Sequence, residues 1–315
     1  MSVPENSALM RALEVPCYPD FIPLSIELKD RLHPRLSLTF DGVSEFTFAG
    51  LYLFRSWYNY RISRFTRCGE DGGFIISGTQ HIGEYAGKKF FSTPCAAPEW
   101  DVLDKLFASH DYWKNISQSV LSPVKDDLEK RGAVFTEDRN NFDYLYDRKE
   151  LAELAGKKFH KKKNHVNNFL SAYPNHRQCQ LTADLIPDAV KILDQWKEDL
   201  FRRTGSEGDY KSAKEALDLF GQLALRGSIF YIDEKPAAYC LGESIARGKM
   251  FAIHFEKAID EYKGIYQYVN QAFASSLPGF FTLLNREQDL GNEGLRQAKM
   301  TYRPCGFVKK YTGRI

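Results

Sequence analysis

Long apolar segments and a signal peptide are both missing from this sequence. No run approaches the ~18 consecutive apolar residues of a membrane-spanning helix. Residues 1–16, MSVPENSALMRALEVP, contain no basic segment followed by an apolar one, as a secretory signal would. We therefore expect a soluble, cytoplasmic protein with no transmembrane segment.

Paired cysteines and an excess of one charge are missing as well. The cysteines have no CxxC pairs and no regular spacing, which argues against a zinc site or a disulfide framework; they are Cys17, Cys68, Cys95, Cys179, Cys240 and Cys305. The 43 basic and 41 acidic side chains leave a net charge of +2, so the chain is no general binder of polyanions. A phosphate or nucleic acid must therefore meet a local basic patch.

The length predicts two lobes. A chain of 315 residues exceeds the ~250–300 residues at which a single hydrophobic core stops growing. The hydrophobic content of 43% and the aromatic content of 14% are sufficient for two cores. We predict an N-terminal lobe over residues 1–150, a basic linking helix over 151–175 and a C-terminal lobe over 176–315.

The N-terminal part has the pattern of a mixed α/β lobe. Alternating apolar and polar residues predict strands over 36–40, 51–54, 58–66, 73–77, 133–137 and 142–147. Helical periodicity predicts helices over 99–110 and 122–131, the second ending at Gly132, and a connecting helix over 148–172. No catalytic motif is recognisable in this part.

The C-terminal part has a more specific pattern. We predict strands over 178–182, 228–232, 237–243, 250–256, 280–285 and 306–312, and helices over 187–203, 211–226, 264–277 and 292–302. The resulting order, β-α-α-β-β-β-α-β-α-β, is that of the N-acetyltransferase fold. The donor of such a fold would lie between the strands over 250–256 and 280–285.

Two segments carry a resemblance to a known family. They are KKFHKKKNHVNN, at 157–168, and EQDLGNEGLRQAKMTYRP, at 287–304. Over nearly its full length the chain resembles the bacterial phosphatidylglycerol lysyltransferase C-terminal-like family, and more distantly the Fem-type aminoacyl transferases. The resemblance implies tandem acetyltransferase-like lobes, each a mixed, mostly antiparallel sheet flanked by helices. It also implies aminoacyl transfer, with a small amine, a peptide or a lipid headgroup as acceptor.

A donor of this kind carries phosphates, and two segments are candidates to bind them. In the first, EYKGIYQ at 261–267, a helix begins after a single glycine, and Lys263, Gly264 and Tyr266 are its candidate contacts. The basic helix supplies the second set: Lys158, Lys161, Lys162, Asn164 and His165. The alternatives are an ordinary helix start with a solvated lysine and a solvated basic face.

Catalytic candidates lie near the ends of the strands predicted over 250–256 and 280–285. Glu256 ends one strand, with His254 two residues earlier, so both are expected to face the same way and Glu256 to act as a general base. Alternatively, either residue is simply paired at the strand end.

The turn after the other strand contains an acidic pair, Glu287 and Asp289, and the next helix places Lys299 and Tyr302 on one face. The pair could hold the amino group of a donor or acceptor. Alternatively, one of these carboxylates forms an internal bridge with Lys299.

Three functions therefore stay open. The first is transfer of an aminoacyl group from an aminoacyl-tRNA-type donor to an amine or hydroxyl. The second is coenzyme A-dependent N-acylation of a small amine, against which the missing Gly-rich turn argues. The third is non-catalytic binding of a nucleotide-like ligand. None of them needs a metal, and the oligomeric state stays open.

Overall fold

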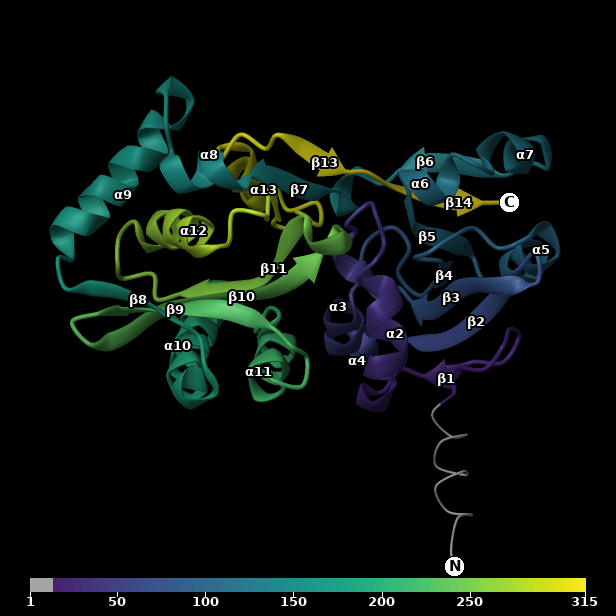
Figure 1. Cartoon of the computed structure of the whole chain (residues 1–315), viewed down its shortest axis with the longest axis horizontal. Helices are drawn as coiled ribbons and strands as arrows, with labels where there is room; N and C mark the ends of the chain where they lie inside the picture. Colours follow the sequence, from purple (N-terminus) through teal and green to yellow (C-terminus); the bar gives the residue numbers. More distant parts are fainter. Residues whose placement is uncertain (1–13) are drawn as a thin grey trace, which may run out of the picture. The chain divides into compact units, whose positions relative to one another are not determined.

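The computed structural model describes residues 14–315 and contains two seven-stranded sheets. The chain forms two compact units: unit 1 comprises the residues up to Asn141 together with Val308–Ile315, and unit 2 comprises Phe142–Phe307. Each unit is one mixed sheet flanked by helices (Figure 1). This arrangement confirms the predicted fold class.

Unit 1 is built on the sheet β1-β2-β3-β4-β5-β14-β6. Its strands are β1 (Ile22–Pro23), β2 (Arg61–Arg67), β3 (Glu70–Thr79), β4 (Lys89–Ser92), β5 (Tyr112–Ser117), β6 (Val134–Glu137) and β14 (Lys310–Arg314). Its helices are α2 (Lys29–Leu36), α3 (Phe48–Leu53), α4 (Arg55–Tyr58), α5 (Trp100–Ser109), α6 (Gln118–Leu121) and α7 (Lys125–Lys130). Apolar side chains of α5, α6 and α7 pack on Phe91 and Trp113 of the sheet to form a core.

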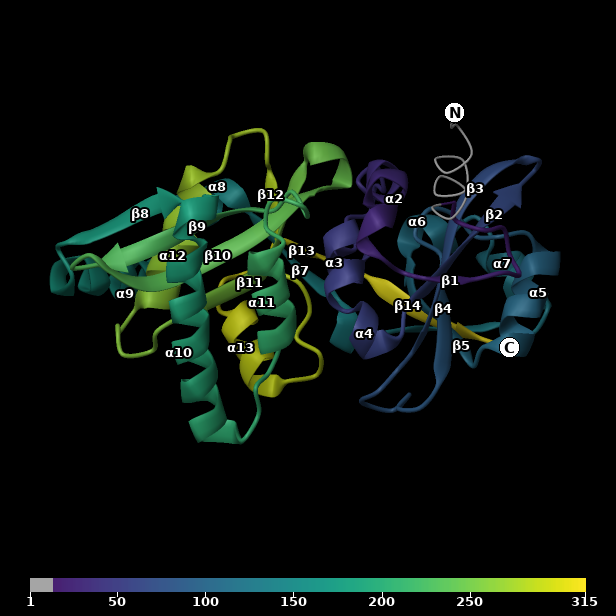
Figure 2. The same ribbon diagram turned by 90° about the horizontal axis from the view of Figure 1, so that it is seen from below.

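Unit 2 is built on the sheet β13-β7-β12-β11-β10-β9-β8. Its strands are β7 (Asp143–Asp147), β8 (His176–Gln180), β9 (Arg226–Ile232), β10 (Lys235–Ile245), β11 (Met250–Ala258), β12 (Leu283–Asn285) and β13 (Gly306–Val308). Its helices are α8 (Arg148–Glu153), α9 (His160–Ala172), α10 (Ile186–Thr204), α11 (Tyr210–Asp218), α12 (Ile265–Ser276) and α13 (Glu293–Met300). Helices α10 and α11 cover one face of the sheet, and α12 with α9 lies on the other (Figures 1 and 2).

The two sheets share one pairing pattern. Counted from β1 in unit 1 and from β8 in unit 2, each of the first three strands is antiparallel to the next. The fourth and fifth strands are parallel: β4 with β5, and β11 with β12. The sixth position is filled by an antiparallel strand from a distant part of the chain, β14 in unit 1 and β7 in unit 2.

This use of distant strands changes the expected boundaries. The segment 142–147, placed in the N-terminal lobe from the sequence, contains β7 of unit 2, and the single strand expected over 306–312 is split between β13 and β14. An alternating sequence specifies that a segment pairs in a sheet, but not which sheet it joins.

Two strand predictions in unit 1 and one helix prediction in unit 2 were wrong. Segment 36–40 follows the end of α2, and most of segment 51–54 lies in α3, where the Thr47 side chain caps the helix by accepting from the Gly50 N–H at 2.8 Å. Short apolar runs fit either period, so tertiary packing decides between helix and strand. The expected helix over 148–172 is broken, because Leu154 and Gly156 adopt positive φ angles between α8 and α9.

No helix in the described part of the chain, residues 14–315, is long and apolar enough to cross a lipid bilayer.

Candidate active site

The polar residues of unit 2 gather where two central strands separate. Strands β11 and β12 pair only from Met250↔Leu283 to Ala252↔Asn285; β12 then ends, while β11 continues to Ala258. The chain leaves β12 through Arg286 and Glu287. Side chains of these residues and of β11 therefore lie at the carboxyl end of a parallel strand pair, where ligands of α/β folds commonly bind.

A β-bulge sets the direction of the β11 side chains. Leu241 pairs with Phe255 and Gly242 with Ile253, so His254 is an extra residue on β11. Gly242 allows the strands to approach, because a Cβ atom there would lie 1.8 Å from the Ala252 carbonyl oxygen.

The bulge also separates the two residues that were expected to face the same way. His254 bonds to Glu243 of β10, whereas Glu256 accepts from Asn270 of α12 at 2.9 Å. A period-two argument fails here because the extra residue shifts the alternation of the strand.

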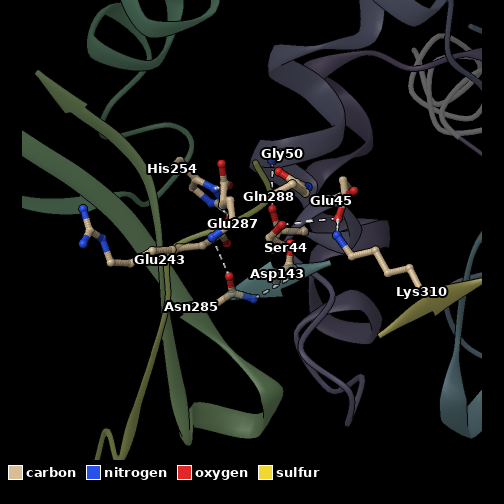
Figure 3. A network of polar contacts seen from close by, with 12 residues as sticks. Ser44, Glu45, Gly50, Asp143, Glu243, His254, Asn285, Glu287, Gln288 and Lys310 are labelled. Carbon is tan, nitrogen blue, oxygen red and sulfur yellow. Dashed lines mark hydrogen bonds and ion pairs between the residues drawn. The ribbon is translucent and has the colours of Figure 1, made fainter. Parts of the chain in front are cut away.

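His254 is held between two carboxylates (Figure 3). Its Nδ1 lies 2.7 Å from Oε1 of Glu287, and its Nε2 lies 3.1 Å from Oε1 of Glu243. Burial opposes a charge on the ring, but the hydrogen bonds and negative charges of both carboxylates outweigh it and raise the pKa of His254 to about 10. The ring is therefore an imidazolium at neutral pH.

Glu287 is the member of this trio that solvent reaches. Its side chain is 27% exposed, against 4% for His254 and 5% for Glu243. Both ring nitrogens of His254 are engaged by carboxylates, and the described residues contain no cluster of His, Cys, Asp or Glu suited to a metal ion. The hydrogen bonds among Glu243, His254 and Glu287 thus fix the position of the partly exposed Glu287 carboxylate.

Lys299 holds the turn that carries Glu287. Its ammonium donates to the carbonyls of Arg286 (2.7 Å), Glu287 (3.1 Å) and Gln288, and Glu287 has a positive φ of 55°. Burial and the nearby Arg286 charge lower the pKa of Lys299 to about 8. With three carbonyls on its ammonium, Lys299 is a positioning residue that stabilises a strained turn.

Asp289 stabilises the same turn through buried hydrogen bonds. It is fully buried and accepts from the Tyr144 hydroxyl at 2.6 Å, the Gly291 N–H at 2.9 Å and the Arg296 guanidinium, twice, at 2.9 Å. Burial alone would raise the pKa of Asp289, but these donors hold it well below its usual range. Asp289 therefore pairs with Arg296, whereas Lys299, the partner considered from the sequence, binds backbone carbonyls instead.

A second polar group lies on the α12 side of the sheet and combines Glu256, Arg286, Tyr302 and Lys162. The Arg286 guanidinium lies 3.3 Å from Oε2 of Glu256 and 5.1 Å from the centre of the Tyr302 ring. The Lys162 ammonium lies over the same ring, at 4.0 Å. We call Lys162, Arg286 and Tyr302 the cationic corner.

The cationic corner carries more positive charge than its one carboxylate balances. Nη1 of Arg286 is buried and hydrogen-bonds no group in residues 14–315. Burial and the charge of Arg286 lower the pKa of Lys162, which has no ion pair in the described structure. Two partly buried cations share one carboxylate here, and desolvated charge without a partner is costly, so this corner is suited to an anionic group.

The remaining residues expected to bind phosphate belong neither to the His254 cluster nor to the cationic corner. Lys158 is paired with Glu150 at 2.6 Å, whereas Lys161, Asn164, His165 and Lys263 are exposed. Gly264 has a φ of 88°, and a Cβ there would lie 3.0 Å from the His165 carbonyl oxygen, so its close approach is to α9. The Tyr266 hydroxyl donates to the Ala258 carbonyl at 3.5 Å.

Comparison with known proteins assigns the chain to a family. The sequence pattern described as phosphatidylglycerol lysyltransferase, C-terminal, matches residues 38–313. The chain belongs to this family. The description of the family names a lysyltransferase, which agrees with the reaction class that the resemblance implied.

Solved structures show the same fold. A conserved protein of unknown function from Bacteroides thetaiotaomicron is 28% identical, with 93% of this chain and 98% of that chain covered and a TM-score of 0.80. The C-terminal domain of a protein assigned as a lysylphosphatidylglycerol synthetase from Agrobacterium fabrum is 14% identical, with 92% of each chain covered and a TM-score of 0.59.

A curated relative is an uncharacterized protein of Mycoplasmoides gallisepticum, 22% identical over 173 residues. The match covers 55% of this chain and spans 56% of the relative's length.

Sequence reasoning missed Arg286 and Glu243. A signal for Glu243 was present, because a glutamate ending the apolar run AAYCLG of a central strand must find a buried partner. Arg286 adjoins the motif that begins at Glu287, but only the separation of β11 from β12 shows that its side chain turns back toward Glu256.

Proposed function

We propose that unit 2 transfers an aminoacyl group from an aminoacyl-tRNA-type donor to an amine or hydroxyl acceptor. The observation that carries the proposal is the Glu287 carboxylate, partly exposed on a rigid turn and fixed by the His254 imidazolium. Family membership supports the reaction class.

Glu287 would act on the nucleophile. His254 engages Oε1, which leaves Oε2 for the neutral amine or the hydroxyl of the acceptor. The carboxylate takes a proton as the acceptor attacks the ester carbonyl, the ester C–O bond breaks, and the donor's hydroxyl leaves with a proton. General-base catalysis of this kind contributes ~10²–10⁴-fold.

The cationic corner would receive an anionic group of the substrates. Arg286 follows β12 directly and Glu287 is the next residue, so an anion site and a proton acceptor come from adjacent positions. The exposed Lys161 and His165 of α9 would extend the contact to a longer phosphate backbone. Suitable acceptors are a small amine, a peptide or a lipid headgroup.

Two further functions rank below this one. A coenzyme A donor would gain from a glycine that admits its pyrophosphate at the start of α12, but Gly264 packs against α9 there. The packing of Gly264 does not bear on the remaining possibility, a unit that binds a nucleotide-like ligand without catalysis.

The test is a transfer assay with a panel of charged tRNAs and with acyl-coenzyme A, comparing the wild type with Glu287→Gln. We expect acceptor-dependent deacylation of one tRNA class and a loss of ~10²-fold or more in the variant. Glu261→Gln, at an exposed position near α12, is the matched control and should retain the rate.

Melting temperatures of the same proteins decide how a negative result is interpreted. A lower melting temperature with unchanged transfer would place Glu287 in the scaffold. Binding of a charged tRNA without turnover in the wild type would favour the non-catalytic alternative.

A further inference from the structure

Unit 1 contains a pocket that no part of the proposed transfer reaction uses. Its volume is about 450 Å³, within the range of small-molecule sites. Aromatic side chains, Tyr18 and Phe21, form part of its wall, and Asn59, Arg61 and Lys89 supply polar groups. Ser77 of β3 and His110, the residue after α5, both line it.

Ser77 and His110 are hydrogen-bonded to each other. The Ser77 hydroxyl oxygen lies 2.9 Å from Nε2 of His110. On the other side of the ring, Nδ1 lies 3.1 Å from the Leu106 carbonyl oxygen. A carbonyl only accepts, so Nδ1 carries the proton in this contact.

The neighbouring Ser109 is consistent with the same tautomer. Its hydroxyl donates to the Lys105 carbonyl at 2.9 Å, which leaves its oxygen to accept from Nδ1 of His110 at 3.0 Å. With the proton on Nδ1, Nε2 has a lone pair and accepts the Ser77 hydroxyl proton. This is the relation of a nucleophile to its general base, with a third group orienting the base.

The surroundings keep the His110 ring in place and neutral. It packs edge-on against Phe91, with ring centres 5.6 Å apart, and contacts Phe21. Burial lowers the pKa of His110 below its ordinary value of 6.5, although the bond to Leu106 opposes the shift. The imidazole is therefore free to take a proton at neutral pH.

We propose that this pocket is a second catalytic site, in which Ser77 is the nucleophile and His110 the general base for cleavage of small esters. Lys89 and Arg61 line the pocket and no acidic side chain among residues 14–315 does, so the preferred substrates carry a negative charge. Asn59 also lines the pocket, and we assign it as the donor to the developing oxyanion.

The step balances without any further reactant than water. The Ser77 oxygen attacks the ester carbonyl while its proton passes to Nε2 of His110. The ester C–O bond breaks, and His110 returns the proton to the departing alkoxide, which leaves as an alcohol. Water, deprotonated by His110, then attacks the acyl-serine carbonyl. The bond from the carbonyl carbon to the Ser77 oxygen breaks, His110 returns the proton to that oxygen, and the acid leaves.

The experiment uses the full chain with a fluorophosphonate probe, intact-mass detection and peptide mapping, together with hydrolysis of p-nitrophenyl esters. We expect one phosphonyl group on Ser77 in the wild type and none in Ser77→Ala. His110→Gln should slow labelling by ~10²-fold or more. Thr66→Ala, which removes an exposed hydroxyl from the adjacent β2, should label like the wild type.

One of the two results that would overturn the proposal comes from the wild type, so the test holds even where a variant does not fold. No label on Ser77, or a label that forms equally fast in His110→Gln, would leave the pair as a structural hydrogen bond. Labelling that falls with pH below 6.5 would support the role of His110, because protonation removes its lone pair. The result does not depend on transfer in unit 2, since none of these residues belongs to that site.

Discussion

Two histidines of this protein, one in each unit, have opposite charge states. His254 of β11 lies between Glu243 and Glu287 and has a pKa raised to about 10. His110 after α5 bonds to a hydroxyl and to a carbonyl, and burial lowers its pKa. Both rings are packed inside a unit, so burial does not explain the difference.

The difference lies in the neighbours. Carboxylates on both nitrogens compensate the charge of an imidazolium, whereas a carbonyl and a hydroxyl serve a neutral ring that is donor on one side and acceptor on the other. His254 therefore cannot act as a base at neutral pH and instead orients Glu287. His110 has the free lone pair that base catalysis needs.

The largest expected effect comes from removing one carboxylate from His254. Glu243→Ala should lower the free energy of unfolding by about 3 kcal/mol, because it leaves a buried cation with one partner. Glu243→Gln, which keeps a hydrogen bond, should recover part of this loss. Chemical denaturation provides the measurement.

Glu234→Ala is the matched control for this change. Glu234 is 78% exposed in its ion pair with Arg177, so the loss should stay within about 0.5 kcal/mol. Equal losses at the two positions would mean that the His254 cluster stores no more energy than a surface pair.

The next effect is the pH dependence of the stabilisation that His254 contributes, which is opposite in sign to that of His110. His254 binds a proton in the folded state up to a pKa of about 10 but loses it above 6.5 when unfolded, so its stabilisation is complete below 6.5 and is lost toward pH 10. Between pH 7 and 9 the loss should be ~2 kcal/mol.

The measurement is the free energy of unfolding of the wild type and of His254→Gln across this range. Subtracting the two removes the contribution of other groups. A difference that stays constant from pH 7 to 9 would contradict the raised pKa.

The smallest effect concerns His110. His110→Gln should lower the stability by about 1 kcal/mol at pH 8, through lost hydrogen bonds and ring packing. Because the pKa of His110 is lowered on folding, its contribution is present above 6.5 and is lost as the pH falls toward the folded pKa. The gap between wild type and variant should therefore narrow in acid, whereas a gap that widens would reverse the assigned charge state.

The order of elements was largely readable from the sequence. Unit 2 follows the predicted alternation from β8 to α13, since its helices are long and periodic and its strands are bounded by clear turns. The motif 287–304 also identified the family and placed Glu287 in the candidate site. Lys162 and Tyr302, proposed separately from the sequence, meet in the cationic corner.

The sequence by itself determined that the chain has two cores, a mixed α/β fold and a charged turn after β12, because composition, periodicity and motif are local properties. Only the tertiary structure decided which sheet β7 and β14 join, that a bulge at His254 turns Glu256 toward α12, and that Lys299 binds three carbonyls rather than a carboxylate. Each of these depends on groups distant in the chain. The charge of a histidine depends in the same way on which atoms folding brings to its two nitrogens.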